Sequence, residues 1–220
     1  MFEIIKSGGW LMAPLILCSI IVVAIVAERL WTLQTKRVAP DHLAAQVWNW
    51  LKNGELDEGR LEILRAGSPL GRILASGLEY RHAKRDVMNE AIEDTGRHVV
   101  HELDRYLISL GTIATISPLL GLLGTVVGIM RVFAAISTTG LGNPQALAGG
   151  ISQALITTVA GLTVAIPAYI LHRYLRGKVD DLVVHMERET IRFMNAVRGA
   201  NSAQDHERPA KNKAAREARA

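Results

Sequence analysis

The sequence predicts an all-α, polytopic membrane protein with three transmembrane helices, two of which extend into a cytoplasmic helical domain. Hydrophobic residues make up 49% of the 220 residues and aromatic residues only 5%, and the charged residues are segregated along the chain. Between Tyr106 and His172, only Arg131 carries a formal charge. Such a separation of apolar and charged stretches is typical of membrane proteins and excludes an ordinary soluble enzyme or a disordered chain. The single cysteine, Cys18, excludes an intrachain disulfide.

Three apolar runs are long enough to cross a bilayer. In the first, residues 10–31, a stretch of 18 uncharged residues would form a helix of roughly 27 Å, close to a hydrocarbon core of ~30 Å. The second run, residues 106–133, and the third, residues 151–172, are separated by a segment whose glycines and proline interrupt a single helix. A cleaved signal peptide is the alternative for the first run, but its apolar core would be only ~7–15 residues long.

The distribution of basic residues predicts the orientation. The N-terminal segment 1–9 and the stretch 131–150 hold one Lys or Arg each, whereas residues 29–105 hold twelve and residues 173–219 hold eleven. Since Lys and Arg accumulate on the cytoplasmic side, we expect the N-terminus and the hairpin 134–150 outside. The loop 32–105 and the C-terminus then lie inside.

The cytoplasmic segments carry helix start and stop signals. We expect short helices over 41–53 and 57–67, a third helix capped by Ser68, and one unbroken helix from Asp86 into the second span. Apolar residues at helical spacing also predict a helical extension over 173–199.

Both helical extensions, from Asp86 and over 173–199, are too apolar on one face to stand alone. We expect them to pack together or against copies of themselves. The tail 200–220 is polar, cationic and poor in bulky residues, so we expect it to be disordered. A loose attraction of this tail to anionic lipids is the functional alternative to a solvated tail.

Small residues and prolines mark the second and third spans. Glycines four residues apart lie on one helix face and allow a second helix to approach closely within lipid. A proline inside a span removes a backbone hydrogen bond, which a neighbouring helix or hydroxyl must compensate, although a tolerated kink is the simpler interpretation. The residues that we assign to helix packing are Pro118, Gly121, Gly124, Gly128, Gly161 and Pro167.

Hydroxyl groups provide most of the polarity in these two spans. Thr125 and Thr158 each lie at the centre of a stripe of small and apolar residues, which is typical of a narrow lumen with sparse hydroxyls. The alternative is that each threonine bonds to its own helix. From residue 105 to residue 179 there is no Asp or Glu. If protons move here, another subunit must supply the ionisable group.

Residues 118–130, PLLGLLGTVVGIM, and residues 150–167, GISQALITTVAGLTVAIP, resemble the paired signatures of the ExbB/TolQ/MotA proton-channel family, and most of all ExbB. The resemblance implies a multi-pass protein of the bacterial inner membrane, with a periplasmic N-terminus, that forms a homopentamer. It implies an ExbD-like single-span partner with a membrane Asp, and a TonB-like protein that the complex energises for uptake across the outer membrane. The residues that match pore positions of the family are Thr125, Thr158, Thr157 and Gln153. At the position of Gln153, many relatives have Glu.

Three other functions stay open at this stage. The chain could be a TolQ-like stator for cell-envelope integrity, or a non-conducting oligomeric membrane scaffold. A membrane enzyme is the weakest alternative, because the sequence shows no nucleophile–base pair and no metal-binding motif. We therefore expect no catalytic residue, no cofactor, no metal and no nucleic-acid partner, and contact with the lipid bilayer.

Overall fold

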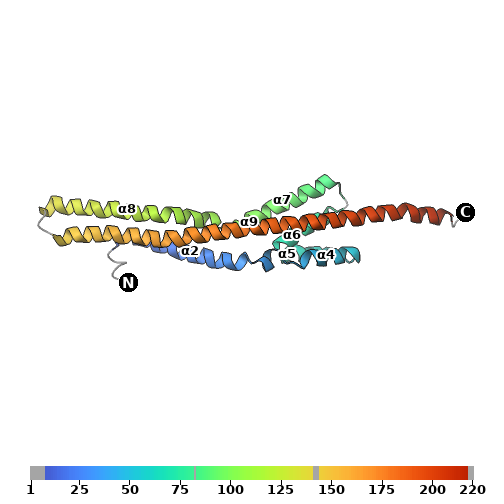
Figure 1. Cartoon of the computed structure of the whole chain (residues 1–220), viewed down its shortest axis with the longest axis horizontal. Helices are drawn as coiled ribbons and strands as arrows, with labels where there is room; N and C mark the ends of the chain where they lie inside the picture. Colours follow the sequence, from blue (N-terminus) through green and yellow to red (C-terminus); the bar gives the residue numbers. More distant parts are fainter. Residues whose placement is uncertain (1–7, 82, 141–143, 218–220) are drawn as a thin grey trace. The chain divides into compact units, whose positions relative to one another are not determined.

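The computed structural model describes residues 8–81, 83–140 and 144–217, and within these ranges the chain is helical with no strand (Figure 1). This confirms the predicted all-α class. The helices are α2 (Met12–Thr32), α3 (Thr35–Val38), α4 (Leu43–Lys52), α5 (Glu58–Gly67), α6 (Pro69–Glu79), α7 (Arg85–Leu103), α8 (Leu107–Thr139) and α9 (Pro144–Glu217).

Three helical stretches are long and apolar enough to cross a membrane. They are Met12–Thr32, Arg85–Thr138 and Leu147–Val197, with mean hydropathies of 2.2, 2.2 and 2.0 in their most apolar parts. The count agrees with the three predicted spans, and the protein is a multi-pass membrane protein.

The chain divides into two compact units. The first, here called the membrane unit, consists of residues 1–31 and 104–177, and the second, the extramembrane unit, of residues 32–103 and 178–220. In the membrane unit, α8 and the first part of α9 run side by side (Figure 1). In the extramembrane unit, α6 packs against α5 and α7.

Local capping explains where the short helices of the extramembrane unit begin. The Asp57 side chain accepts a hydrogen bond from the backbone N–H of Arg60 at 2.9 Å and caps α5. Ser68 does the same for Gly71 at 3.0 Å and caps α6, and Pro69 occupies the first turn of α6. These two predicted helix starts are confirmed. The side chain of Arg60 also hydrogen-bonds Glu55 at 2.6 Å, which lowers the pKa of the Glu55 carboxyl.

The predicted unbroken helix from Asp86 into the second span is wrong, because the chain leaves the helical conformation between α7 and α8. Tyr106 has φ 63°, in the left-handed region that a bulky side chain rarely adopts. Its ring lies under two guanidinium groups, with the Cζ atoms of Arg29 and Arg105 at 5.2 and 4.8 Å from the ring centroid. Asp104 is held in turn by Arg176 at 2.8 Å. These contacts hold the break in place.

The connection between α8 and α9 is shorter than the predicted hairpin 134–150. Helix α8 continues to Thr139 and ends at Gly140, which has φ 68°, and α9 already begins at Pro144. Pro144 therefore starts a helix instead of breaking one, because the first helical position needs no backbone N–H. Gly142, also expected to break the helix, lies outside the described residues.

The C-terminal segment also differs from the expectation of a disordered tail over 200–220. The structure continues α9 as a helix to Glu217, and residues 218–220 lie outside the described ranges. The physical reason lies in the composition, since Ala, Lys, Arg and Glu are strong helix formers. The extension over 173–199 is helical, as its spacing predicted.

Candidate functional site

A close contact between α8 and α9 forms the centre of the membrane unit. A Cβ atom placed on Gly124 would lie 2.3 Å from the Oγ1 of Thr157, and one on Gly128 would lie 2.7 Å from the Cβ of Ala154. Real Cβ atoms do not approach neighbours so closely, so these positions require glycine. We call this contact the α8–α9 seam.

The seam continues toward the other end of the two helices. A Cβ atom on Gly121 would lie 3.2 Å from the carbonyl oxygen of Thr157, and one on Gly161 would lie 2.6 Å from the carbonyl oxygen of Ser117. The four glycines thus lie where two backbones come together, as a small-residue face allows within lipid.

The two prolines do not interrupt the helices, since Pro118 lies inside α8 and Pro167 inside α9. Next to Pro118, the hydroxyl of Ser117 is buried and donates to the carbonyl of Ile113 at 2.8 Å. The proline therefore lies in a turn where a side-chain hydroxyl adds a hydrogen bond to a backbone carbonyl.

The predicted pore hydroxyls occupy two different environments. Thr157 is fully buried in the seam, where its hydroxyl lies 2.7 Å from the carbonyl of Gln153 on its own helix. Thr125 and Thr158 are half-buried. The Thr125 hydroxyl donates to the carbonyl of Leu122 at 2.6 Å. Thr157 is therefore a packing residue within this chain, whereas Thr125 and Thr158 reach its surface.

Thr158 also connects the two helices of the seam. Its hydroxyl lies 3.1 Å from the carbonyl of Gly121 on α8 and 3.2 Å from the carbonyl of Ala154 on α9. The oxygen stands at the edge of the seam with a backbone acceptor on either side. A hydroxyl with one hydrogen bonds one of these carbonyls at a time, so it can exchange partners at small cost.

Apolar surface surrounds these two threonines. Leu122 and Ile129 on α8, and Leu155 and Leu162 on α9, are all exposed, whereas Ala165 is buried. The predicted stripes of α8 and α9 are therefore open along most of their length in the single chain. Such a surface can contact lipid or another protein helix. The polar groups at its centre are the hydroxyls of Thr125 and Thr158.

A polar contact that the sequence did not predict lies at the end of the seam nearest the connection between α8 and α9. The guanidinium Nη1 of Arg131 donates to the Oε1 of Gln153 at 2.5 Å. The amide Nε2 of Gln153 lies 3.5 Å from the carbonyl oxygen of Gly8, so the side chain joins α8, α9 and the segment before α2. Arg131 is exposed, but Gln153 is buried. The sequence signal was the presence of one charged residue and one amide near the ends of adjacent spans.

Comparison with known proteins agrees with this architecture. The model of the MotA/TolQ/ExbB proton channel family matches residues 65–188. A "Putative biopolymer transport protein ExbB homolog" of Methanothermobacter thermautotrophicus is 31% identical over 186 residues, which are 84% of this chain and 66% of that protein.

Two further relatives carry the names ExbB and TolQ. "Biopolymer transport protein exbB1" of Vibrio cholerae is 31% identical over 192 residues, which are 85% of this chain and 83% of that protein. "Tol-Pal system protein TolQ" of Haemophilus influenzae is 41% identical over 81 residues, which are 37% of this chain and 36% of that protein.

Proposed function

This chain belongs to the MotA/TolQ/ExbB proton channel family, and we propose that it is the ExbB-like stator subunit of a motor driven by the proton-motive force. In this proposal the chain lies in the bacterial inner membrane, with the N-terminus in the periplasm and the C-terminus in the cytoplasm. Copies of the chain form a ring, of five in our proposal, around the membrane helices of an ExbD-like partner.

The observation that carries the proposal is a missing functional group. Residues 105–179 contain hydroxyls but no Asp or Glu, so the second and third spans of this chain have no carboxylate to carry a proton. A partner that brings a membrane Asp would complete the path. Thr125 and Thr158 are the hydroxyls of the predicted path that reach the surface of the chain.

The geometry of Thr158 suggests how it serves such a partner. With no acid present, its hydroxyl is satisfied by the carbonyls of Gly121 and Ala154. When an ionised carboxylate arrives, rotation about the Cβ–Oγ1 bond redirects the hydrogen to it, because a charged acceptor forms a stronger hydrogen bond. Protonation of the acid weakens that bond and lets the partner helix leave the site.

The energy of one proton is large enough for this step. A proton that moves through about 150 mV releases roughly 3.5 kcal/mol, at ~2.3 kcal/mol per 100 mV. A hydrogen bond from a threonine to a carboxylate contributes about 1.5–3 kcal/mol. One proton can therefore drive the breaking and remaking of one such contact, and a movement between the subunits follows. We propose that this movement energises a TonB-like protein and through it uptake across the outer membrane.

Replacement of Thr158 by Val tests the role of this hydroxyl. The variant keeps the shape of the side chain but loses the hydroxyl, so it should assemble normally and abolish outer-membrane uptake of iron–siderophore complexes. Thr163→Val is the matched control, because the Thr163 hydroxyl is exposed and donates to its own helix at 2.7 Å. It should leave uptake intact. Normal uptake by the Thr158 variant would refute the pore role.

A TolQ-like role in envelope integrity is the second candidate, and the similarity to the Haemophilus influenzae TolQ protein favours it. Deletion of the chain distinguishes the two. Loss of siderophore uptake supports the ExbB-like function, whereas sensitivity to detergents with normal uptake supports the TolQ-like function.

A further inference from the structure

A histidine lies at the end of the α8–α9 seam that is farthest from the connection between the two helices. A Cβ atom on Gly111 would lie 3.0 Å from the Nε2 atom of His172 and 3.2 Å from its Cε1 atom. The edge of the imidazole ring that carries Nε2 therefore packs against α8 at a position without a side chain. His172 is half-buried. In the proposed orientation, this end of the seam faces the cytoplasm.

Both residues of this contact keep the register of the predicted pore hydroxyls. Gly111 precedes Thr125 by fourteen residues within α8. His172 follows Thr158 by the same number of residues within α9. Fourteen residues are about 3.9 helical turns and roughly 21 Å, so His172 lies on the same face of α9 as Thr158, within ~40°. Between the two on this face, Tyr169 is 63% exposed and supplies a further hydroxyl.

The ring nitrogens of His172 are available for proton transfer. Among the residues that the structure describes, neither nitrogen takes part in a hydrogen bond or an ion pair. Histidine takes up and releases protons readily near neutral pH and serves as a proton shuttle in many proteins. His172 is also the only histidine in the sequence of the membrane unit, residues 1–31 and 104–177. This unit therefore offers one imidazole for the release of a proton.

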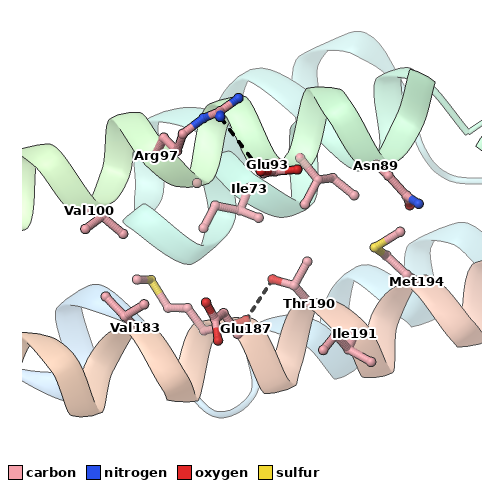
Figure 2. Close-up of a pocket in the computed structure, with 13 residues that line it drawn as sticks. Ile73, Asn89, Glu93, Arg97, Val100, Val183, Glu187, Thr190, Ile191 and Met194 are labelled. Carbon is pink, nitrogen blue, oxygen red and sulfur yellow. Dashed lines mark hydrogen bonds and ion pairs between the residues drawn. The ribbon is translucent and has the colours of Figure 1, made fainter. Parts of the chain in front are cut away.

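Most other ionisable side chains belong to the extramembrane unit. Figure 2 shows three of them, Glu93, Arg97 and Glu187, around a groove between α7 and α9. In the membrane unit, by contrast, residues 107–171 contain no Asp, Glu, His or Lys. A proton that travels inward along α8 and α9 therefore meets His172 as the first of these groups.

The carboxylates at this end of the membrane unit are already paired with arginines. Arg176, one turn after His172, lies 2.8 Å from Asp104. Residues 107–130 of α8 carry no charge. The other charged or titratable side chains at this end are Arg105, Tyr106, Arg173 and the ion pair of Arg29 with Glu28. The imidazole of His172 is thus the group at this end that can accept a proton without breaking an ion pair.

We propose that His172 is the proton-release group of the motor. In this step the O–H bond of the partner's protonated Asp breaks, and water along the shared face of α8 and α9 carries the proton inward. An N–H bond forms on the imidazole of His172, and the imidazolium then gives the proton to cytoplasmic water. The carboxylate and the neutral imidazole are thereby restored. The inference rests on the proposed function and adds the residue through which the proton leaves.

Replacement of His172 by Gln tests this role in liposomes that contain the chain together with its ExbD-like partner. Glutamine is polar but takes up no proton near neutral pH, so the flux driven by an imposed membrane potential should fall at least about tenfold. His98→Gln is the matched control and should leave the flux unchanged, since the His98 imidazole is 78% exposed in the extramembrane unit. The variants are compared at equal amounts of assembled complex. Normal flux in the His172 variant would overturn the inference.

Chemical rescue separates proton transfer from packing. Imidazole added on the side of the C-terminus should restore most of the flux of His172→Gln, because a free base can take over the release of the proton. Thr158→Val should gain nothing from imidazole, since it lacks the hydroxyl of the earlier step. Lost flux that imidazole does not restore would assign His172 a packing role and overturn the inference. A wild-type complex without flux would refute the proposed function itself, and the inference with it.

Discussion

The Oγ1 atom of Thr157 lies where a Cβ atom on Gly124 would come within 2.3 Å of it, so the closest packing of α8 and α9 depends on a missing side chain. In lipid, the association of helices relies on such close contact, because burial from water provides no driving force. This contact therefore sets how the exposed faces of α8 and α9 are oriented relative to each other.

Gly124→Ala should destabilise the membrane unit. The added methyl group overpacks the seam, at a cost of about 1–3 kcal/mol. Gly149→Ala is the control, since a Cβ atom there meets no other atom within 4 Å, and the change should be neutral or stabilise α9 by up to ~1 kcal/mol. Thermal unfolding in lipid nanodiscs measures both. Equal midpoints for the two variants would show that the seam is not tightly packed.

Gln153→Leu should weaken the end of the seam nearest the connection between α8 and α9. The variant leaves the guanidinium of Arg131 without the amide oxygen 2.5 Å away, which we expect to cost about 1–3 kcal/mol of unfolding free energy. Gln153→Glu keeps an acceptor and adds a charge, so its stability should equal or exceed that of the wild type. Unfolding midpoints in the same nanodiscs test this order, and a Leu variant as stable as the wild type would contradict it.

Tyr106→Leu should loosen the junction between α7 and α8. The ring of Tyr106 interacts with the guanidinium groups of Arg29 and Arg105, and the loss of such a cation–π contact costs about 0.5–2 kcal/mol. Tyr106→Phe keeps the ring and should match the wild type. Hydrogen exchange at residues 104–110 reports on the junction, and identical exchange in the Leu and Phe variants would rule out the ring contact as its support.

The features that the sequence predicted correctly depend on neighbouring residues in the chain. Asp57 and Ser68 each cap a helix by accepting a hydrogen bond from a backbone N–H three residues later. A short stretch of sequence is therefore enough to predict these helix starts. The three spans follow from length and apolarity in the same way. The start of α9 at Pro144 also depends on a local signal, a proline at the first helical position. The nearby glycines led us to interpret this proline as a helix breaker instead.

The features that no local pattern shows depend on distant parts of the chain. The break at Tyr106 is supported by Arg29, which lies 77 residues earlier, and no local pattern at 104–106 announces it. The sequence placed Thr157 and Thr158 together as pore residues. Only the packing of α8 against α9 distinguishes the buried Thr157 from the half-buried Thr158.

Proton flux in liposomes tests the central claim most directly, namely that this chain supplies hydroxyls and a partner supplies the acid. The purified chain alone, in liposomes with an imposed membrane potential, should give no proton flux above that of empty vesicles. Reconstitution with an ExbD-like partner should produce flux, and replacement of the partner's membrane Asp by Asn should remove it. Selective proton conduction by the chain alone would contradict the account.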